Sequence, residues 1–133
     1  LGRGFVLKEG FEYVWATNTI TDLPLPFIPP MRNQLELRYE ADHFNAFFRW
    51  EYVFAQDRVE RNERETADAS LLHVGVTGKW NLSGVPVNLT LAVQNIFNVP
   101  FFDHLSRYRQ LNIPEPGRNI MVRLVVPLEW ENR

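Results

Sequence analysis

The sequence predicts an all-β protein, an antiparallel up-and-down meander of about six strands. Apolar and polar side chains alternate with a period of two in six segments, as they do in strands whose successive side chains point to opposite faces. Short and long links between these segments also alternate along the chain. No segment has the apolar spacing of an amphipathic helix of convincing length. Together, these observations favour sequential strands whose short turns all lie at one end.

The first three predicted strands differ in regularity. The opening stretch is the least regular, although Phe11, Tyr13 and Trp15 alternate with Glu12, Val14 and Ala16. In the second strand, leucines and a tyrosine alternate with Gln, Glu and Arg, and in the third an aromatic-rich face alternates with a mixed one. These patterns predict strands over residues 3–17, 32–41 and 44–56.

The last three predicted strands alternate more strictly. Apolar residues at every second position oppose His, Gly, Thr and Lys in the fourth strand, and Asn, Thr, Ala and Gln in the fifth. In the sixth strand, the even positions from Ile120 to Trp130 are all apolar. The predicted strands span residues 70–80, 87–96 and 118–130.

The links between the strands suggest where each end of the sheet lies. Only Asp42 and His43 separate the second and third strands, and residues 81–86 have a compact turn composition. The other links are long, over residues 18–31, 57–69 and 97–117. Outer-membrane barrels have this arrangement of short turns at one end and long loops at the other, although soluble lipocalin-like barrels share it in part.

Composition excludes several classes of protein. The 133 residues suffice for one domain or part of a larger one. A balance of 14 basic and 16 acidic residues argues against nucleic acid as a partner. The chain has no cysteine for a disulfide or thiolate site, and no run of 18 apolar residues for a transmembrane helix. It begins without a basic-then-apolar leader, so we expect a mature chain or an excised piece.

The aromatic residues suggest which face meets which solvent. Trp80, Trp130 and Phe44 fall at the short-turn ends of their strands, whereas Tyr13, Trp15, Tyr52 and Phe54 fall at the long-loop ends. Two aromatic bands bounding an apolar stripe match the girdles of a membrane barrel. We therefore expect Trp15, Trp80 and Trp130 at membrane interfaces, with charged side chains facing the lumen. A soluble small-ligand-binding β-barrel, with its faces inverted, remains the alternative.

Six strands are too few to close a wide barrel. They leave two open edges, which folded proteins normally pair or cover. We therefore expect the chain to be one sector of a larger object. If it is isolated, we expect its edges to pair with copies of itself.

Three loop segments resemble those of TonB-dependent outer-membrane receptors. Residues 23–32, LPLPFIPPMR, resemble that family's LP-x-IPP-x-R segment. Gln56-Asp57 followed by Glu65-Thr66 is similar to its next hairpin. Asn95-Ile96-Phe97-Asn98, His104-Leu105-Ser106 and residues 113–119 (IPEPGRN) resemble its last extracellular loop, and the strand ending at Trp130 resembles an outer-membrane assembly signal. The matched order covers the chain from about residue 11 to residue 130.

The resemblance implies that residues 1–133 form the C-terminal portion of a 22-stranded transmembrane barrel whose plug domain is absent from this sequence. The whole receptor would lie in the lipid of the bacterial outer membrane. It would bind a scarce nutrient complex, typically a ferric siderophore, haem, cobalamin or a glycan. TonB, engaged through the missing N-terminal part, would drive import.

The motif residues have physical roles that suit loop architecture better than ligand contact. Prolines interrupt backbone pairing before a strand, Gly117 can adopt a positive φ, and the guanidinium groups of Arg32 and Arg118 can brace loop carboxylates or carbonyls. We therefore predict that the following residues shape the outer rim: Pro29, Pro30, Arg32, Asn95, Pro114, Gly117 and Arg118.

Few residues suggest chemistry. The three histidines, His43, His73 and His104, are too scattered for a local metal motif, and no cofactor is expected. His104, Arg107, Tyr108 and Arg109 form a basic, aromatic cluster suited to an anionic ligand such as a ferric siderophore. The more ordinary interpretation is a solvated loop that braces its neighbours.

Charged residues elsewhere have ordinary explanations. The mixed-charge run 57–65 is expected to be a solvated outer loop. Glu36, Glu40 and Glu51 lie opposite Arg38 and Arg49 and should pair across strands. An enzyme using paired lumen carboxylates is a third hypothesis, but no catalytic motif supports it, and the sequence predicts a protein that is not an enzyme.

Overall fold

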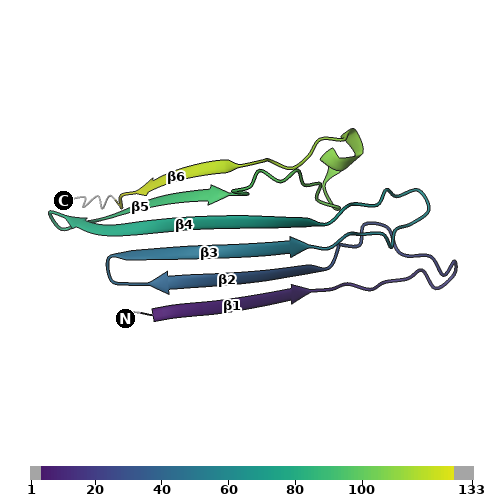
Figure 1. Cartoon of the computed structure of the whole chain (residues 1–133), viewed down its shortest axis with the longest axis horizontal. Coiled ribbons are helices and arrows are strands. Elements are labelled where there is room, and N and C mark those ends of the chain that lie inside the picture. Colours follow the sequence, from purple (N-terminus) through teal and green to yellow (C-terminus); the bar gives the residue numbers. More distant parts are fainter. Residues whose placement is uncertain (1–3, 128–133) are drawn as a thin grey trace, which may run out of the picture.

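The computed structural model describes residues 4–127, and its main element is one antiparallel sheet with the strand order β1-β2-β3-β4-β5-β6. Each strand pairs with the next along the chain, so the predicted all-β meander is confirmed (Figure 1). The 3-10 helix η1 (Arg107–Leu111) lies outside the sheet. The strands are β1 (Gly4–Glu12), β2 (Arg32–Glu40), β3 (Phe44–Val53), β4 (Ala69–Leu82), β5 (Val85–Gln94) and β6 (Asn119–Val125).

The short turns lie at one end of the sheet and the long loops at the other (Figure 1). The turn predicted over residues 81–86 contains only Ser83 and Gly84, because β4 and β5 pair as far as Leu82 and Val85. Both turn residues have positive φ, 53° and 90°, as a tight two-residue hairpin requires. We call residues 13–31, 54–68 and 95–118 the first, second and third long loops.

The first and last strands differ from the sequence-based expectation. β1 ends at Glu12 rather than near residue 17, and Thr17 forms only an isolated bridge with Pro24. β6 ends at Val125. Val126 and Pro127, which the expected strand included, are described but are not part of it. The rest of the expected strand, residues 128–130 with the interfacial Trp130, lies outside the described residues.

The register gives the sheet one apolar face that crosses all six strands. Phe5, Leu37, Phe48, Val74 and Ile120 are among its members. Glu9 is the only charged residue that the described strands place on this face. Many of its large side chains are solvent-exposed, including Phe5 at 73 %, Ile120 at 71 % and Val122 at 65 %.

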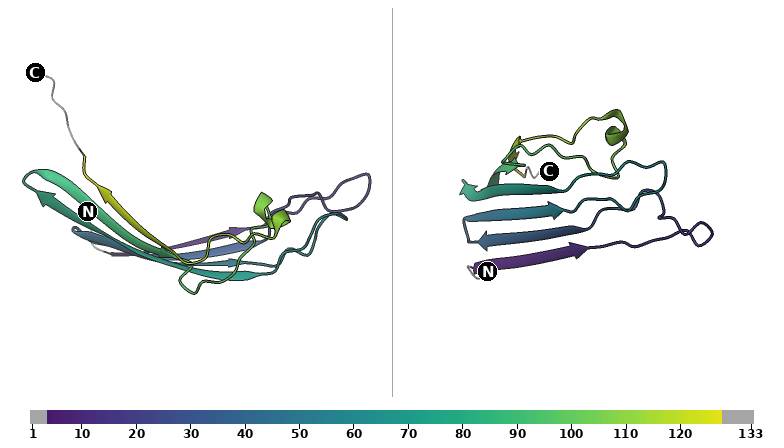
Figure 2. Two further views of the ribbon diagram at one scale, coloured as in Figure 1. Left: turned by 90° about the horizontal axis from the view of Figure 1, so that it is seen from above. Right: turned by 45° about the vertical axis from the view of Figure 1, so that its right-hand side comes forward.

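The opposite face carries the other charged side chains of the strands. Glu36 is nearly buried at its centre, where it pairs with Arg38 of the same strand and Arg49 of β3 at 2.7 Å each. The predicted cross-strand pairing is thus present. The strands bow, and η1 lies on the concave side of the sheet (Figure 2). The third long loop packs on the charged face, because its Phe101 clusters with Val53, Ala69 and Leu71.

This cluster is small, so the sheet has little core of its own. Within residues 4–127 it comprises four buried residues with Val99 packed against it, all at the long-loop end. None of the helical structure in this part of the chain is long and apolar enough to cross a membrane.

Candidate functional site

The three long loops interlock through residues of the recognised motifs. Gln56 and Thr66 pair with each other in an isolated antiparallel bridge, with N···O distances of 2.9 and 3.1 Å. The Gln56 side chain also donates to the carbonyl of Ile28 at 3.0 Å, which ties the second loop to the first. The motifs that lie far apart in sequence therefore meet in one junction.

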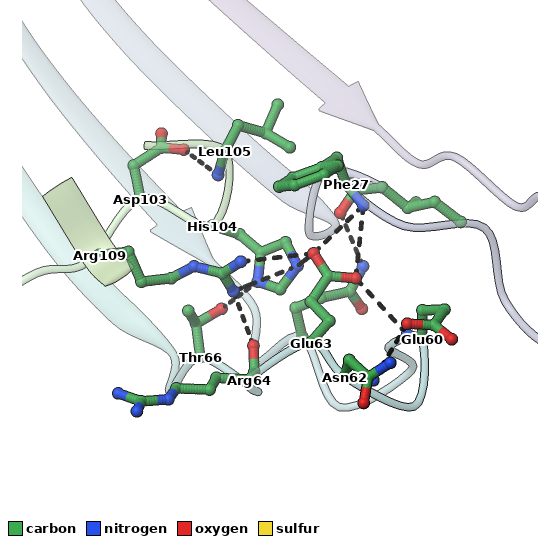
Figure 3. A network of polar contacts seen from close by, with 12 residues as sticks. Phe27, Glu60, Asn62, Glu63, Arg64, Thr66, Asp103, His104, Leu105 and Arg109 are labelled. Carbon is green, nitrogen blue, oxygen red and sulfur yellow. Dashed lines mark hydrogen bonds and ion pairs between the residues drawn. The ribbon is translucent and has the colours of Figure 1, made fainter. Parts of the chain in front are cut away.

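The Glu63 carboxylate is the centre of this junction (Figure 3). Its oxygens accept hydrogen bonds from the Phe27 amide of the first loop at 3.1 and 3.3 Å. From the third loop, His104 Nε2 lies 3.1 Å away and Arg109 Nη2 lies 3.3 Å away. One carboxylate thus connects all three loops. Its side chain is only 7 % exposed, so the prediction that the whole 57–65 run is solvated was wrong for this residue.

His104 is 1 % exposed and has partners on both ring nitrogens. Arg109 Nη1 lies 2.8 Å from Nδ1, and Thr66 Oγ1 lies 3.0 Å from the same atom. A guanidinium can only donate, so Nδ1 accepts and the ring proton sits on Nε2, which donates to Glu63. Arg109 also donates to the Arg64 carbonyl at 2.6 Å. The geometry therefore assigns one neutral tautomer.

The electrostatics agree with a neutral ring. Burial lowers the pKa of His104 below its usual value, and the Arg109 guanidinium lowers it further, although Glu63 and Asp103 act in the opposite direction. At neutral pH the cluster is a salt bridge between Arg109 and Glu63 with an uncharged imidazole against it.

Arg32 joins the sheet to the third loop. Its guanidinium contacts Glu51 of β3 at 3.3 Å and Asp103 at 2.6 Å, in the bracing role that the sequence predicted. Burial alone would raise the pKa of Asp103, but hydrogen bonds from Arg32 and the Leu105 amide outweigh that effect and the pKa lies below its usual value.

Asn95 and Arg118 hold the two ends of the third loop. Asn95 has a φ of 49° and ends β5, and its side chain exchanges two hydrogen bonds of 2.9 Å with the backbone of Val99. Arg118 Nε donates to the Ile96 carbonyl at 2.8 Å, and its amide donates to the Asn98 side chain.

Gly117 and the prolines complete the predicted rim residues. Gly117 does not have a positive φ, so that reason for a glycine was wrong. An added Cβ at this position would instead meet the Asn98 side chain, whose oxygen accepts the Arg118 amide hydrogen bond. Pro30 is almost fully buried, Pro29 is half-buried and Pro114 is exposed.

The four predicted ligand-contact residues do not share one environment. His104 and Arg109 are buried in the junction and face other loops. Arg107 and Tyr108 lie on η1 and are exposed, with Tyr108 at 61 %. Sequence reasoning missed Glu63 and Thr66 as partners of His104. These two residues lie about forty positions away from His104, and no periodicity relates one loop to another.

Aromatic side chains of the described residues gather at both ends of the apolar face. Near the short turns, the rings of Phe5 and Phe44 flank Tyr39 at 4.9 and 5.5 Å. Trp80, beside the second short turn, covers Gly78.

At the loop end, Trp50, Tyr52 and Phe54 form a row of neighbouring rings, with centroids 6.2 and 4.7 Å apart. Trp15 lies in the first loop, where the Arg58 guanidinium sits 3.6 Å from the centre of its ring.

The contacts of the junction join the three long loops to one another. Across residues 4–127 there is no group of three or more His, Asp or Glu side chains placed to hold a metal ion. The loops border a half-open cavity of about 420 Å³ beside the junction, which Phe27, Glu63, Arg64, Arg109 and Gln110 help to line.

A solved structure shares this fold. No protein-family model matches the sequence, and no curated protein matches it. The copper transporter OprC is similar in structure, with a TM-score of 0.78 and 24 % sequence identity over 90 % of this chain. The matched region is 20 % of that protein, so the chain spans about one fifth of its length. At this identity, the likeness shows the fold.

Proposed function

We propose that this chain is the C-terminal portion of the β-barrel of a TonB-dependent receptor in the bacterial outer membrane. In this role, the six strands form a sector of a 22-stranded barrel. Other strands of the same barrel pair with β1 and β6, and a plug domain fills the lumen. The role is transport rather than catalysis.

One observation carries the proposal: an exposed apolar face with aromatic rings at both ends. A face that meets water would not leave Phe5, Leu7 and Ile120 each more than 60 % exposed in a continuous apolar surface. Phe44 and Phe54 lie about 33 Å apart along the strand. At a tilt of about 40°, this separation covers about 25 Å of membrane, the height of an outer-membrane apolar band.

Two further observations support the proposal. Several residues of the loop motifs that resemble the receptor family, namely Ile28, Gln56, Thr66 and His104, take part in the junction. The similar fold of a transporter, of which this chain spans one fifth, fits a sector of a larger barrel.

The proposed cargo is a scarce nutrient complex, of which a ferric siderophore is our first choice. Haem, cobalamin and a glycan remain alternatives, and the name of the similar transporter adds copper. Arg107 and Tyr108 are exposed on η1 and are our candidates for contact with an anionic cargo. Uptake of radiolabelled ferric siderophore by cells with and without the gene tests this choice.

Site-directed spin labelling tests the orientation of the sheet. Single cysteines replace Ile120, Met121, Val122 and Arg123 in the full-length protein in membranes. Lipid-soluble oxygen should relax labels at Ile120 and Val122, which lie on the apolar face. A water-soluble nickel chelate should preferentially relax labels at Met121 and Arg123. The soluble alternative predicts a protein that fractionates without detergent, with labels on the apolar face shielded from both reagents, and that result would overturn the proposal.

A further inference from the structure

His104 fills the junction at the point where the third loop meets the second. The charged groups that act on His104 are Glu63, from the second loop, and Asp103 and Arg109, which belong to the third loop itself. Glu63 extends the junction to the Phe27 amide of the first loop. Only the neutral Nε2–H form of the ring satisfies Arg109 and Glu63 together.

We propose that His104, Glu63 and Arg109 form an acid-sensitive latch that holds the three long loops together at neutral pH and releases them when His104 is protonated. The latch comprises loop residues alone, so it does not depend on the identity of the cargo or on the orientation of the sheet.

The geometry explains why protonation opens the latch. A second ring proton would sit on Nδ1, which faces Arg109 Nη1 at 2.8 Å. The imidazolium and the Arg109 guanidinium, both positively charged donors, would then face each other in a nearly water-free site. The hydrogen bond that Arg109 donates to Nδ1 would be lost. Separating the loops allows the imidazolium to be hydrated. Because Glu63 and Arg109 also line the neighbouring cavity, opening would widen that cavity.

The sign of the pH dependence follows from the direction of the shift. The pKa of His104 is lower in the closed loops than its usual value of 6.5. The stabilisation is therefore fully present above about pH 6.5 and is lost as the pH falls through the lowered pKa. The ratio of open to closed loops can rise by up to about tenfold per pH unit, the limit for one proton.

Distance measurements between loops test the latch in the full-length protein. Cysteines replace the exposed residues Arg61 and Leu111 in a protein without other cysteines, and each carries a spin label. The distance between the two labels is measured by double electron–electron resonance. At pH 8 we expect one narrow distance distribution. At pH 5 we expect a broad and longer one, with a midpoint below pH 6.5.

Two substitutions identify the titrating group. His104→Gln keeps an N–H donor for Glu63 but takes up no proton, so its distribution should not change between pH 8 and pH 5. His43→Gln, in the exposed turn at the far end of the sheet, should respond as the wild type does. An unchanged wild-type distribution, or a pH response that survives in His104→Gln, would overturn the latch. The wild-type titration needs no substitution at His104 and therefore decides the question if that variant fails to fold.

Discussion

Arg32 lies at the boundary between the sheet and the long loops. It opens β2, and its guanidinium reaches both Glu51 of the neighbouring strand and Asp103 of the third loop. These groups are about three-quarters buried, so each contact is less screened than an ordinary surface ion pair. The proline-rich segment before Arg32 delivers it to this position, because Pro29 and Pro30 keep the backbone extended into the strand.

Replacing Arg32 with Gln should lower the free energy of unfolding by about 1–2 kcal/mol at pH 7. The reason is that Asp103 and Glu51 lose a charged donor while remaining largely shielded from water. Because the pKa of Asp103 lies below its usual value of 3.8, its contribution is present above that pH and is lost as the pH falls through the lowered pKa. The difference between the wild type and the variant should therefore shrink below about pH 4.

Denaturant unfolding of the full-length protein at pH 7 and at pH 3 measures this difference. Arg61→Gln is the matched control, since Arg61 is an exposed arginine in the second loop. A difference that is the same at both pH values would show that the Arg32–Asp103 pair does not account for the loss.

At the scale of elements, the strands were predictable because alternation is a local signal. The bounds of β2 and β3 agree with the expected ranges to within three residues, and β4 and β5 to within two. The errors have local causes. Asn95 adopts a positive φ and ends β5 early. Two positive-φ residues allow the 83–84 turn to be shorter than the six residues of turn composition suggested.

The junction was only partly predictable. Motif resemblance identified Gln56, Thr66 and His104 as notable residues, and the chemistry of a guanidinium at the start of a strand suggested the bracing role of Arg32. It gave no partner for His104, because contacts between loops depend on how each loop closes in three dimensions. The charge pattern of residues 57–65 signalled a solvated loop, and nothing in that pattern distinguishes buried Glu63 from its exposed neighbours.

Gly75 illustrates a packing requirement within β4. The Phe47 ring lies over this glycine from the neighbouring strand, and Arg49 stacks on the same ring with its guanidinium 5.4 Å from the centroid. In Gly75→Val, the new side chain would collide with the ring and displace both residues. We expect a loss of about 1–3 kcal/mol in unfolding free energy, the usual cost of overpacking.

Gly10→Val provides the comparison for Gly75→Val. Gly10 lies on the same face in β1, and a Cβ there would meet no atom within 4 Å. Denaturant unfolding of both variants measures the difference. Equal effects at the two glycines would indicate that backbone conformation, rather than the Phe47 contact, explains the cost.

At the scale of the whole molecule, the two faces of the sheet carry different kinds of side chain. The charged face carries the Glu36 network and receives the third long loop, whereas the apolar face carries many large exposed apolar side chains. A sheet with so small a core needs a large apolar environment on its other side. The proposed membrane supplies such an environment. Because a membrane has a finite thickness, the cost of a charged substitution should depend on its depth, which would not be so in a protein interior.

Arginine substitutions along the apolar face should cost more at its centre than at its ends. Phe48 lies on β3 close to midway between Phe44 and Phe54, at the two ends of the apolar face, so Phe48→Arg should cost about 2–4 kcal/mol in lipid vesicles. Leu82→Arg, beside the short turn, should cost about 0–1 kcal/mol because its guanidinium can reach the headgroups. Met121→Arg, on the charged face, should also cost little. Unfolding of the three variants in vesicles measures this gradient. A soluble barrel would bury Phe48 and Leu82 in one core, so equal costs at these two positions would contradict the membrane assignment.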